Sequence, residues 1–507
     1  MPSGSLTRRE LLGRGARTAL LAARTGGLGA LTACSSTPRA DQDLRRLARS
    51  VSGRVVAPRQ PGYADAKLLF NPQFDGARPL AIVFCRTPED VATTVGFARK
   101  HEIVPAARSG RHSFGGYSAP TDGIVVDVSE MRGIQVAPDR ESVTVGPGAL
   151  NVDLYSTLGP QGLVVPTGTC PTVGVAGLTL GGGFGYSSRA FGLTADNLLD
   201  LELVLASGER VTCSPTQEPD LFWACRGGGG GNFGIVTSFR FKVHFIAEVA
   251  TYDLTWDWRD ATAVIEAWQQ WAPETPDELY STCALSRSGG PQPQGPSITS
   301  AGQYFGSATR LAELIEPLEA AARPVSRHVA RTSFVEAQRK WAGDDCAPDE
   351  CSRQAANPYK VKSAFFDRSI PEDGIATAIE EMERWPGSAA SSPSVGLELN
   401  SWGGAINRVP ASDTAFVHRD ARFLAIYGSA WSQQDGDAAI AANREWLEGF
   451  AARMDPYSSG FAYQNLIDPT LEDWQRAYYG SNHPRLTEVK QTYDPDDVFR
   501  FPQGIGS

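Results

Sequence analysis

Arg108-Ser109-Gly110-Arg111-His112-Ser113 and Pro166-Thr167-Gly168-Thr169-Cys170-Pro171-Thr172-Val173-Gly174 are the two stretches that decide the fold of this 507-residue chain. Each contains glycine, which lets a loop approach a cofactor closely. Imidazole and thiolate are the side chains best suited to attack an oxidised isoalloxazine ring. We therefore predict a flavin that is tethered to the protein twice, through His112 and Cys170.

The second stretch opens a long glycine-rich segment. Residues 166–185 are mostly glycine and small residues, and they end in Gly181-Gly182-Gly183-Phe184-Gly185. Glycine at this density lets backbone amides approach a phosphate or a flat ring. Apolar residues such as Val175 and Leu178 are interleaved, and a flexible linker would lack them. We therefore interpret this segment as part of a ligand-binding site.

Length and charge set the broad class of the protein. A chain of 507 residues is too long for one core and predicts two domains. The formal net charge of −10 argues against nucleic acid or an anionic membrane face as a partner. No stretch is long and apolar enough to be a membrane span in the mature fold. Small molecules are the expected partners.

The first 34 residues differ from the rest. Thr7-Arg8-Arg9-Glu10-Leu11-Leu12 is a twin-arginine pattern, and small and apolar residues follow it. We predict that residues 1–34 are an export signal and that the protein is extracellular or attached to the cell surface. Leu31-Thr32-Ala33-Cys34 also resembles a lipobox. Cys34 would then be either a lipid anchor or removed with the signal.

The remaining cysteines differ in their surroundings. Cys346 and Cys351 lie close together in a polar loop, where an exported protein permits a disulfide. Two solvated thiols are the alternative, and the sequence does not choose between them. No cysteine or histidine spacing resembles a metal site. The cysteines predicted to be buried, unreactive thiols are Cys85, Cys213, Cys225 and Cys283.

Strand and helix signals alternate in the first half of the chain. Leu80-Ala81-Ile82-Val83-Phe84 and Ile103-Val104-Pro105-Ala106-Ala107 are predicted strands on either side of a helix that starts near Thr87-Pro88-Glu89-Asp90. The second of these strands runs into the His112 loop. Further predicted strands are residues 124–128, 142–145 and 239–243. The pattern predicts an α+β or α/β unit with its ligand at the loop ends.

The pattern changes after residue 246. Residues 308–322 and 438–454 are predicted amphipathic helices, and residues 395–400 and 422–427 are predicted strands. This mixture indicates a second domain, built as a sheet with helices on one face.

Taken together, these motifs resemble the berberine-bridge-enzyme-like oxidases of the vanillyl-alcohol-oxidase superfamily, which have a PCMH-type FAD-binding domain. The resemblance covers nearly all of the chain after the signal. It rests on the two cofactor loops, the 181–185 turn, Gly234-Ile235-Val236-Thr237, Trp402-Gly403-Gly404-Ala405 and the tail segments 478–486 and 493–503.

The resemblance implies an α+β fold and an order of domains. A two-subdomain FAD-binding domain would occupy residues 35–245. A substrate domain, with an antiparallel sheet covered by helices, would occupy residues 246–459. A C-terminal segment, residues 460–507, would return to the FAD-binding domain.

The resemblance also assigns roles to the flavin residues. His112 would bond the 8α-methyl carbon of FAD, and Cys170 would bond carbon C6. Val173 takes the position that guards oxygen access in the family, and a small valine there favours an oxidase over a dehydrogenase. Backbone amides that cradle an anion explain the glycines among the other flavin-binding residues. These residues are Ser109, Gly110, Arg111, Ser113, Gly174, Gly177, Gly181, Gly182, Val236 and Asn482.

The chain departs from the family near the substrate. Phe114, Phe184 and Leu466 stand where family members carry tyrosine, and Ile426 stands where glutamate or glutamine is common. Removal of a hydride from an alcohol needs a base for the hydroxyl proton. The usual base is therefore missing from its usual place.

Four polar residues are the candidates that could replace this base. Glu398 and Asn400 alternate along a predicted strand, so their side chains share one face of a sheet. Tyr463 and Asn465 would share a face by the same argument. For each of them, a structural polar role is the alternative to catalysis.

These observations predict an exported oxidase with bicovalently bound FAD. An organic donor, such as an alcohol, a sugar or a secondary-metabolite ring, would give a hydride to the flavin, and molecular oxygen would take the electrons and become hydrogen peroxide. One alternative is an oxidative cyclase or desaturase whose substrate loses its proton without this base. The other is a flavoprotein that binds an apolar ligand without catalysis.

Overall fold

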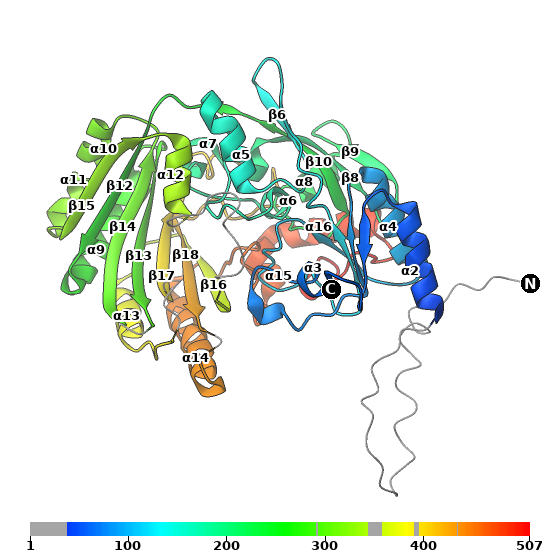
Figure 1. The fold of residues 1–507 in the computed structure, drawn as a ribbon. Helices are drawn as coiled ribbons and strands as arrows, with labels where there is room; N and C mark the ends of the chain where they lie inside the picture. The colour runs from blue at the N-terminus through cyan, green and yellow to red at the C-terminus, as the bar shows by residue number, and fades with distance from the viewer. Residues whose placement is uncertain (1–37, 291–292, 343–356, 390–394, 433) are drawn as a thin grey trace, which may run out of the picture.

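The computed structural model describes residues 38–290, 293–342, 357–389, 395–432 and 434–507. They form a four-stranded, a five-stranded and a seven-stranded sheet, together with a two-stranded ribbon. The seven-stranded sheet lies on one side of the molecule, and the two smaller sheets lie on the other (Figure 1). The predicted export signal, Cys34, Cys346 and Cys351 lie outside the described residues.

The four-stranded sheet carries the His112 loop. The residues of its two central strands are fully buried, because both faces are covered. Helix α4 (Pro88–Lys100) covers it and begins where the Thr87 side chain accepts the backbone N–H of Asp90. Three of the strands run parallel, so β3 and β4 end at the same edge of the sheet. In spatial order the strands are β1 (Arg54–Val56), β2 (Ala81–Phe84), β4 (Ile124–Asp127) and β3 (Pro105–Arg108).

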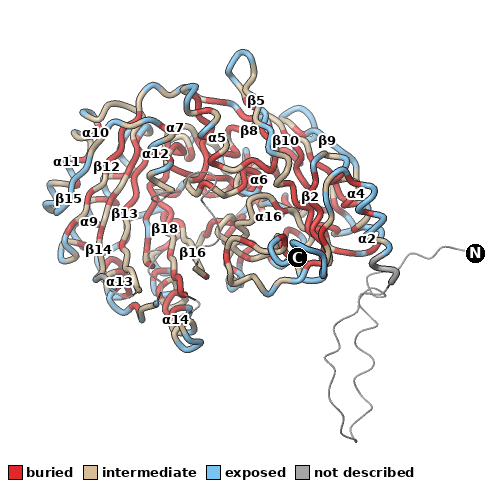
Figure 2. Tube along the Cα trace, viewed as in Figure 1, coloured by how far each residue is buried: buried red, intermediate tan, exposed pale blue. Residues whose placement is uncertain are grey.

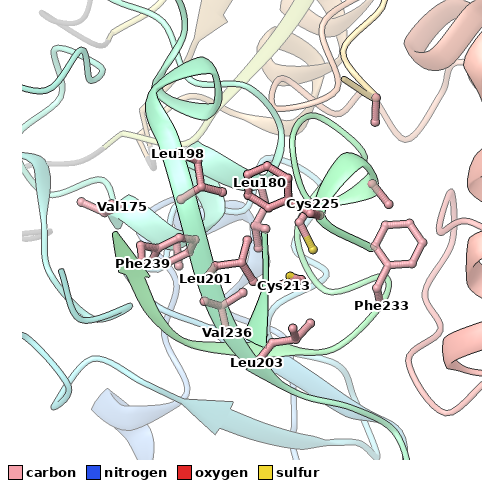
Figure 3. Packing of buried hydrophobic residues seen from close by; sticks show 14 of the residues in the cluster. Val175, Leu180, Leu198, Leu201, Leu203, Cys213, Cys225, Phe233, Val236 and Phe239 are labelled. Carbon is pink, nitrogen blue, oxygen red and sulfur yellow. The ribbon is translucent and has the colours of Figure 1, made fainter. Parts of the chain in front are cut away.

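The five-stranded sheet is antiparallel and supports the Cys170 loop, which runs from β7 (Leu163–Val164) of the two-stranded ribbon to helix α6 (Val175–Leu180). Val175 and Leu180 of this short helix belong to the same buried cluster as Leu201, Val236 and Phe239 of the sheet (Figure 3). This packing holds the start of α6 and the glycine-rich turns on the sheet. In spatial order the strands are β5 (Ile134–Val136), β6 (Ser142–Val145), β10 (Ile235–Lys242), β8 (Leu198–Val204) and β9 (Arg210–Cys213).

The seven-stranded sheet is antiparallel throughout, and helices cover one of its faces. Its central strands are largely buried, whereas helix α14 carries exposed stretches on its outer side (Figure 2). The covering helices are α9 (Ala261–Trp271), α10 (Ala308–Leu314), α11 (Glu316–Ala321), α13 (Glu372–Glu383) and α14 (Asp437–Met454). In spatial order the strands are β15 (Ser326–Thr332), β12 (Val249–Trp256), β14 (Gln294–Tyr304), β13 (Leu279–Ser288), β17 (Val395–Ser401), β18 (Phe423–Ala430) and β16 (Tyr359–Phe366).

The C-terminal residues return to the smaller sheets. Helices α15 (Trp474–Tyr479) and α16 (His483–Tyr493) pack in the same core as the five-stranded sheet. The buried Lys490 donates to the Asn232 carbonyl at 2.9 Å and to Asp494 at 2.7 Å. The Ile505 N–H donates to the Asn232 side chain at 2.8 Å. These bonds hold the tail against Asn232, which directly follows the glycine run Gly227–Gly231.

The α+β class predicted from the sequence is confirmed, with two local corrections. Residues 308–322 form two helices because Pro317, at the start of α11, has no N–H to continue the first one. Tyr463 and Asn465 do not lie on a strand. Residues 463–466 form a turn closed by the Leu466 N–H and the Tyr463 carbonyl at 2.9 Å. The four cysteines predicted to be buried thiols are free and buried.

Candidate active site

One cavity of about 950 Å³ connects the two cofactor loops to the seven-stranded sheet. This volume is at the upper end for a small-molecule site. His112 and Cys170 line one part of the cavity, and Glu398, Asn400 and Ile426 of the sheet line another. The tail contributes the segment 500–503. The cavity therefore joins residues from the whole length of the described chain.

A buried ion pair fixes the start of the His112 loop. Arg108 and Asp127 are the last residues of the adjacent strands β3 and β4, and Arg108 Nε donates to Asp127 Oδ2 at 2.6 Å. Neither side chain is exposed. Arg108 also donates to the Ala66 carbonyl at 2.7 Å. The chain thus leaves β3 in a defined direction toward His112.

The two cofactor loops touch each other through glycine. A Cβ atom at Gly110 would lie 2.2 Å from the Gly174 nitrogen and 2.6 Å from the Thr172 carbonyl oxygen. A Cβ atom at Gly174 would lie 2.2 Å from Ser109 Oγ. Any side chain at either position would push the loops apart. This contact is the structural reason for glycine at both positions.

The contact brings both nucleophiles to one hydroxyl group. His112 Nε2 lies 2.8 Å from Thr172 Oγ1, and Cys170 Sγ lies 3.9 Å from the same oxygen. The Phe70 ring stacks on the imidazole with a centroid distance of 4.1 Å. The ring plane of His112 is therefore held from one side while Thr172 holds its edge.

Burial governs the ionisation of both groups. Loss of hydration lowers the pKa of His112 to about 4, so the imidazole is neutral at physiological pH and keeps a lone pair. Burial raises the pKa of the Cys170 thiol. Hydrogen bonds from the Thr172 hydroxyl and from the backbone N–H groups of Thr172 and Val173 act in the opposite direction. A neutral imidazole and a thiol with donors around it are chemically able to bond a flavin.

The backbone around these loops fits a large, flat ligand with phosphates. Gly177, Gly229, Gly230 and Gly231 all line the cavity. A Cβ atom at Gly177 would meet nothing within 4 Å, so the bare backbone of α6 faces open space. Val173 and Val236 add apolar contacts to the lining. The donor set and the open glycine backbone match what FAD needs.

Glu398 supplies a carboxylate to the other part of the cavity. Along β17, Leu397 and Leu399 point into the core under the helices, whereas Glu398 and Asn400 line the cavity, as period-two alternation requires. Glu398 Oε1 accepts a hydrogen bond from Asn400 Nδ2 at 3.0 Å, and Asn400 Oδ1 accepts one from Tyr280 at 3.0 Å. These two bonds orient the carboxylate.

Glu398 is open to the cavity but lies deep in the protein. Burial raises the pKa of its carboxyl group, and the hydrogen bond from Asn400 lowers it, with burial the larger cause. Among the described residues that line the cavity, the other carboxylate is Asp122, an exposed loop residue. Glu398 is therefore the carboxylate in this lining that can act as a base toward a ligand at the sheet.

Tyr463 and Asn465 form a second polar group in the cavity lining. The Tyr463 oxygen accepts hydrogen bonds from the Gly183 N–H and from Asn465 Nδ2, each at 2.9 Å. Burial raises the pKa of Tyr463, so its phenol is neutral at neutral pH. Because the phenol oxygen already accepts two hydrogen bonds, the hydroxyl proton of Tyr463 remains available for donation to a ligand. Tyr463 is thus a hydrogen-bond donor rather than a base.

The rest of the lining is apolar and aromatic. The four apolar residues that the sequence analysis placed near the substrate all line the cavity. They are Phe114, Phe184, Ile426 and Leu466. A further wall pairs Tyr186 with Trp341, whose rings stack at 4.2 Å with an angle of 2° between their planes. Such a wall suits a ring-shaped or extended ligand.

Comparison with known proteins places the chain in a family. Residues 79–214 match the FAD binding domain family, and residues 462–506 match the berberine and berberine-like family. The FAD-linked oxidoreductase YgaK of Bacillus subtilis is 37% identical over 90% of this chain and 97% of its own. The chain belongs to the berberine-bridge-enzyme-like FAD-linked oxidoreductases. It is an FAD-dependent oxidoreductase.

Other members of this family are similar along most of their length. The xylooligosaccharide oxidase of Thermothelomyces thermophilus is 32% identical over 84% of this chain and 87% of its own. The structure of berberine bridge enzyme from Eschscholzia californica superposes with a TM-score of 0.82 at 26% identity, over 91% of this chain and 98% of the other. The berberine-bridge-enzyme-like fold therefore extends over the described chain.

Within this berberine-bridge-enzyme-like fold, not every residue predicted to bind the flavin lies at the cavity. Gly181 packs on Asn465, Gly182 faces Phe416, and Asn482 donates to the carbonyls of the 411–415 loop. The three are absent from the cavity lining. Asn482 instead anchors the tail. The predicted flavin residues that line the cavity are Ser109, Gly110, Arg111, His112, Ser113, Cys170, Val173, Gly174, Gly177 and Val236.

Sequence reasoning missed several residues of the lining. Gly229, Gly230, Gly231 and Asn232 line the cavity, and the density of glycine in this stretch was the signal that could have indicated a role. Tyr186, Tyr280 and Trp341 carry no local motif. Tyr280 and Trp341 reach the cavity because strand β13 and helix α12 (Phe334–Trp341) fold against the flavin loops, whereas Tyr186 directly follows the 181–185 turn.

Proposed function

We propose that this protein is an oxidase with FAD bound through both His112 and Cys170. The observation that carries the proposal is that one cavity holds a neutral imidazole, a hydrogen-bonded thiol and, on the facing sheet, one oriented carboxylate. FAD, when bound, would accept a hydride from the substrate and pass the electrons to molecular oxygen, giving hydrogen peroxide. The chain's own residues would tether the flavin, orient the substrate and accept its proton.

Glu398 is proposed as the general base. Its Oε1 atom is engaged by Asn400, which leaves Oε2 to accept the hydroxyl proton of the substrate as the hydride leaves carbon. Tyr463 would donate its proton to a substrate oxygen or to the flavin ring and so hold the reacting groups in place. This assignment argues against a binder without a base, since a carboxylate faces the cavity.

The proposed substrate is an alcohol, a sugar or a secondary-metabolite ring. The stacked Tyr186 and Trp341 rings would support a flat or sugar-ring face, and Glu398 would engage a hydroxyl group. Relatives named xylooligosaccharide oxidase and reticuline oxidase fit these classes. An oxidative cyclase or desaturase would use the same hydride transfer.

Val173 supports oxygen as the electron acceptor. Its small side chain lines the cavity three residues after Cys170. Among the structural neighbours, one variant of the pollen protein Phl p 4 is titled a glucose dehydrogenase, and the variant with an added isoleucine-to-valine change is titled a glucose oxidase. A valine near the flavin is in keeping with oxidase activity.

The mature protein is proposed to be exported by the twin-arginine route, as an extracellular or lipid-anchored protein. Residues 1–34 carry the motif, and among the described helices none is long and apolar enough to cross a membrane. Cell fractionation, followed by N-terminal analysis of the mature chain, distinguishes cleavage from lipidation at Cys34. A full-length chain retained in the cytoplasm would contradict export.

The function is tested on the purified holoprotein in two steps. The protein is first denatured and separated from non-covalently bound flavin, and its mass is measured by mass spectrometry. The expected mass exceeds that of the polypeptide by one FAD. The holoprotein is then mixed without oxygen with sugars, alcohols and phenolic compounds, and bleaching of the flavin identifies the donor. Admission of oxygen should restore the colour with release of hydrogen peroxide. A flavin that no compound in the panel reduces would overturn the oxidase proposal for these donor classes.

A further inference from the structure

Thr172 lies between the two residues proposed to hold the flavin. Its Oγ1 atom is 2.8 Å from His112 Nε2 and 3.9 Å from Cys170 Sγ, the second distance being near the upper limit for a hydrogen bond to sulfur. The Thr172 side chain is half-buried. One hydroxyl group is thus within hydrogen-bond reach of both nucleophiles, although they come from different loops.

A hydroxyl group can accept one hydrogen bond and donate another at the same time. If Oγ1 accepts from His112 Nε2–H, the imidazole is held in the tautomer that leaves its lone pair on Nδ1. The hydroxyl proton is then free to point at Cys170 Sγ, where it stabilises the thiolate. The opposite arrangement, with Thr172 donating to Nε2, would place a proton on Nδ1 and leave the sulfur without this donor.

We infer that Thr172 is the positioning residue for flavin attachment, and that its single hydroxyl prepares His112 Nδ1 and the Cys170 thiolate for bonding to the flavin. The inference rests on the proposed function, because it requires both covalent bonds. It adds a role for a residue that makes no covalent bond itself. Thr172 acts through the two nucleophiles and not on the substrate.

The neighbouring residues support this geometry. Phe70 stacks on the His112 ring at 4.1 Å, so rotation of the imidazole away from Thr172 would break the stack. The backbone N–H groups of Thr172 and Val173 also donate toward Cys170. The close packing of Gly110 on the Thr172 carbonyl holds the 170–174 turn against the His112 loop. The hydroxyl is therefore in a fixed position.

The chemistry of attachment balances with oxygen as the oxidant. For Cys170, a bond forms between sulfur and a flavin ring carbon, and the thiol hydrogen and the ring hydrogen are released. For His112, a bond forms between Nδ1 and the flavin methyl carbon, and the imidazole hydrogen and one methyl hydrogen are released. In each case two electrons pass through the flavin to dioxygen, which with two protons becomes hydrogen peroxide.

The test compares three variants as purified, full-length holoproteins. Thr172→Val keeps the shape but removes the hydroxyl, and Thr172→Ser restores the hydroxyl. Thr167→Val is the matched control, because Thr167 is buried three residues before Cys170 and its hydroxyl has, within the described part of the chain, a single 3.4 Å contact to the Gly168 carbonyl. The readout is the mass of the peptides that contain His112 and Cys170, after a fixed time with added FAD in air.

Thr172→Val is expected to bind FAD but to reduce the fraction of flavin-linked Cys170 peptide about ten-fold or more, the change produced by losing one hydrogen bond to a charged group. Linkage at His112 should also slow. Thr172→Ser and Thr167→Val should match the wild-type protein. A merely structural role for Thr172 would instead reduce total FAD binding and leave the ratio of linked to loose flavin unchanged.

The outcomes separate the two proposals. If the wild-type protein carries no covalent flavin, the bicovalent attachment itself is wrong. If the wild type is linked twice and Thr172→Val is linked equally fast at both residues, the role of Thr172 is wrong and the proposed function stands. Loss of linkage in Thr167→Val would also overturn the inference, because the effect would not depend on the Thr172 hydroxyl.

Discussion

Replacement of Arg108 by methionine should strongly destabilise the part of the protein that holds the flavin. Arg108 and Asp127 form an ion pair at 2.6 Å in which neither side chain is exposed. In Arg108→Met, the Asp127 carboxylate would stay buried, and its one remaining hydrogen-bond donor among the described residues would be the Ser129 N–H at 2.9 Å. The Ala66 carbonyl would also lose its donor.

The structure sets the size of the effect. Breaking a buried pair by removing one partner costs about 3–5 kcal/mol, because the remaining charge has no compensation. This corresponds to a fall of about two to three and a half orders of magnitude in the folding equilibrium. The double variant Arg108→Met/Asp127→Leu removes both charges, and apolar replacement of a buried pair is often close to neutral. It should therefore recover most of the lost free energy of unfolding.

Urea unfolding of the holoproteins, followed by flavin fluorescence, measures these differences. Arg86→Met is a suitable control, since Arg86 pairs with Glu130 on the surface and such pairs contribute about 0–1 kcal/mol. The reasoning fails if Arg108→Met loses less than about 1 kcal/mol, the surface-pair value, or if the double variant is less stable than the single one.

Three further predictions concern the cavity. Glu398→Gln should slow anaerobic flavin reduction by about 10²–10⁴-fold. Because burial raises the pKa of Glu398 above the ordinary value of a glutamate, the wild-type rate should fall as the pH drops through this raised pKa, and a wild-type profile flat in acid would contradict the assignment. Val173→Ile should slow reoxidation of the reduced flavin by oxygen and leave reduction unchanged, which stopped-flow absorbance checks. Gly110→Ala should reduce covalent flavin content, measured by mass, because its Cβ atom would lie 2.2 Å from the Gly174 nitrogen, whereas Gly133→Ala, with nothing within 4 Å, should not.

The sequence predicted the local elements well where the signal was local. The alternation of Leu397, Glu398, Leu399 and Asn400 was sufficient to place two polar side chains on one face of a strand, and the structure places both at the cavity. Thr87 and Pro88 likewise marked the start of a helix. In each case the pattern within a few residues determines the geometry.

Prediction failed where distant contacts decide the geometry. Nothing near Asn482 shows that its amide is used by the 411–415 loop. Nothing near Trp341 shows that it stacks on Tyr186 in the cavity. The turn at Tyr463 satisfies the strand pattern by chance, and its shape follows from contacts with Gly183 and the 178–181 segment.

The site separates flavin attachment from substrate choice. His112 lies in the loop that follows β3 of the four-stranded sheet, and Cys170 and Thr172 lie in the loop that leads into helix α6. Glu398, Asn400 and Ile426 come from the seven-stranded sheet. A substitution on the seven-stranded sheet can change the polarity of the cavity without touching the Gly110–Gly174 contact that joins the cofactor loops. An apolar residue at Ile426 and a carboxylate at Glu398 are therefore compatible with an intact flavin site. Substrate specificity should accordingly respond to changes in β17 and β18, and covalent flavin content should not.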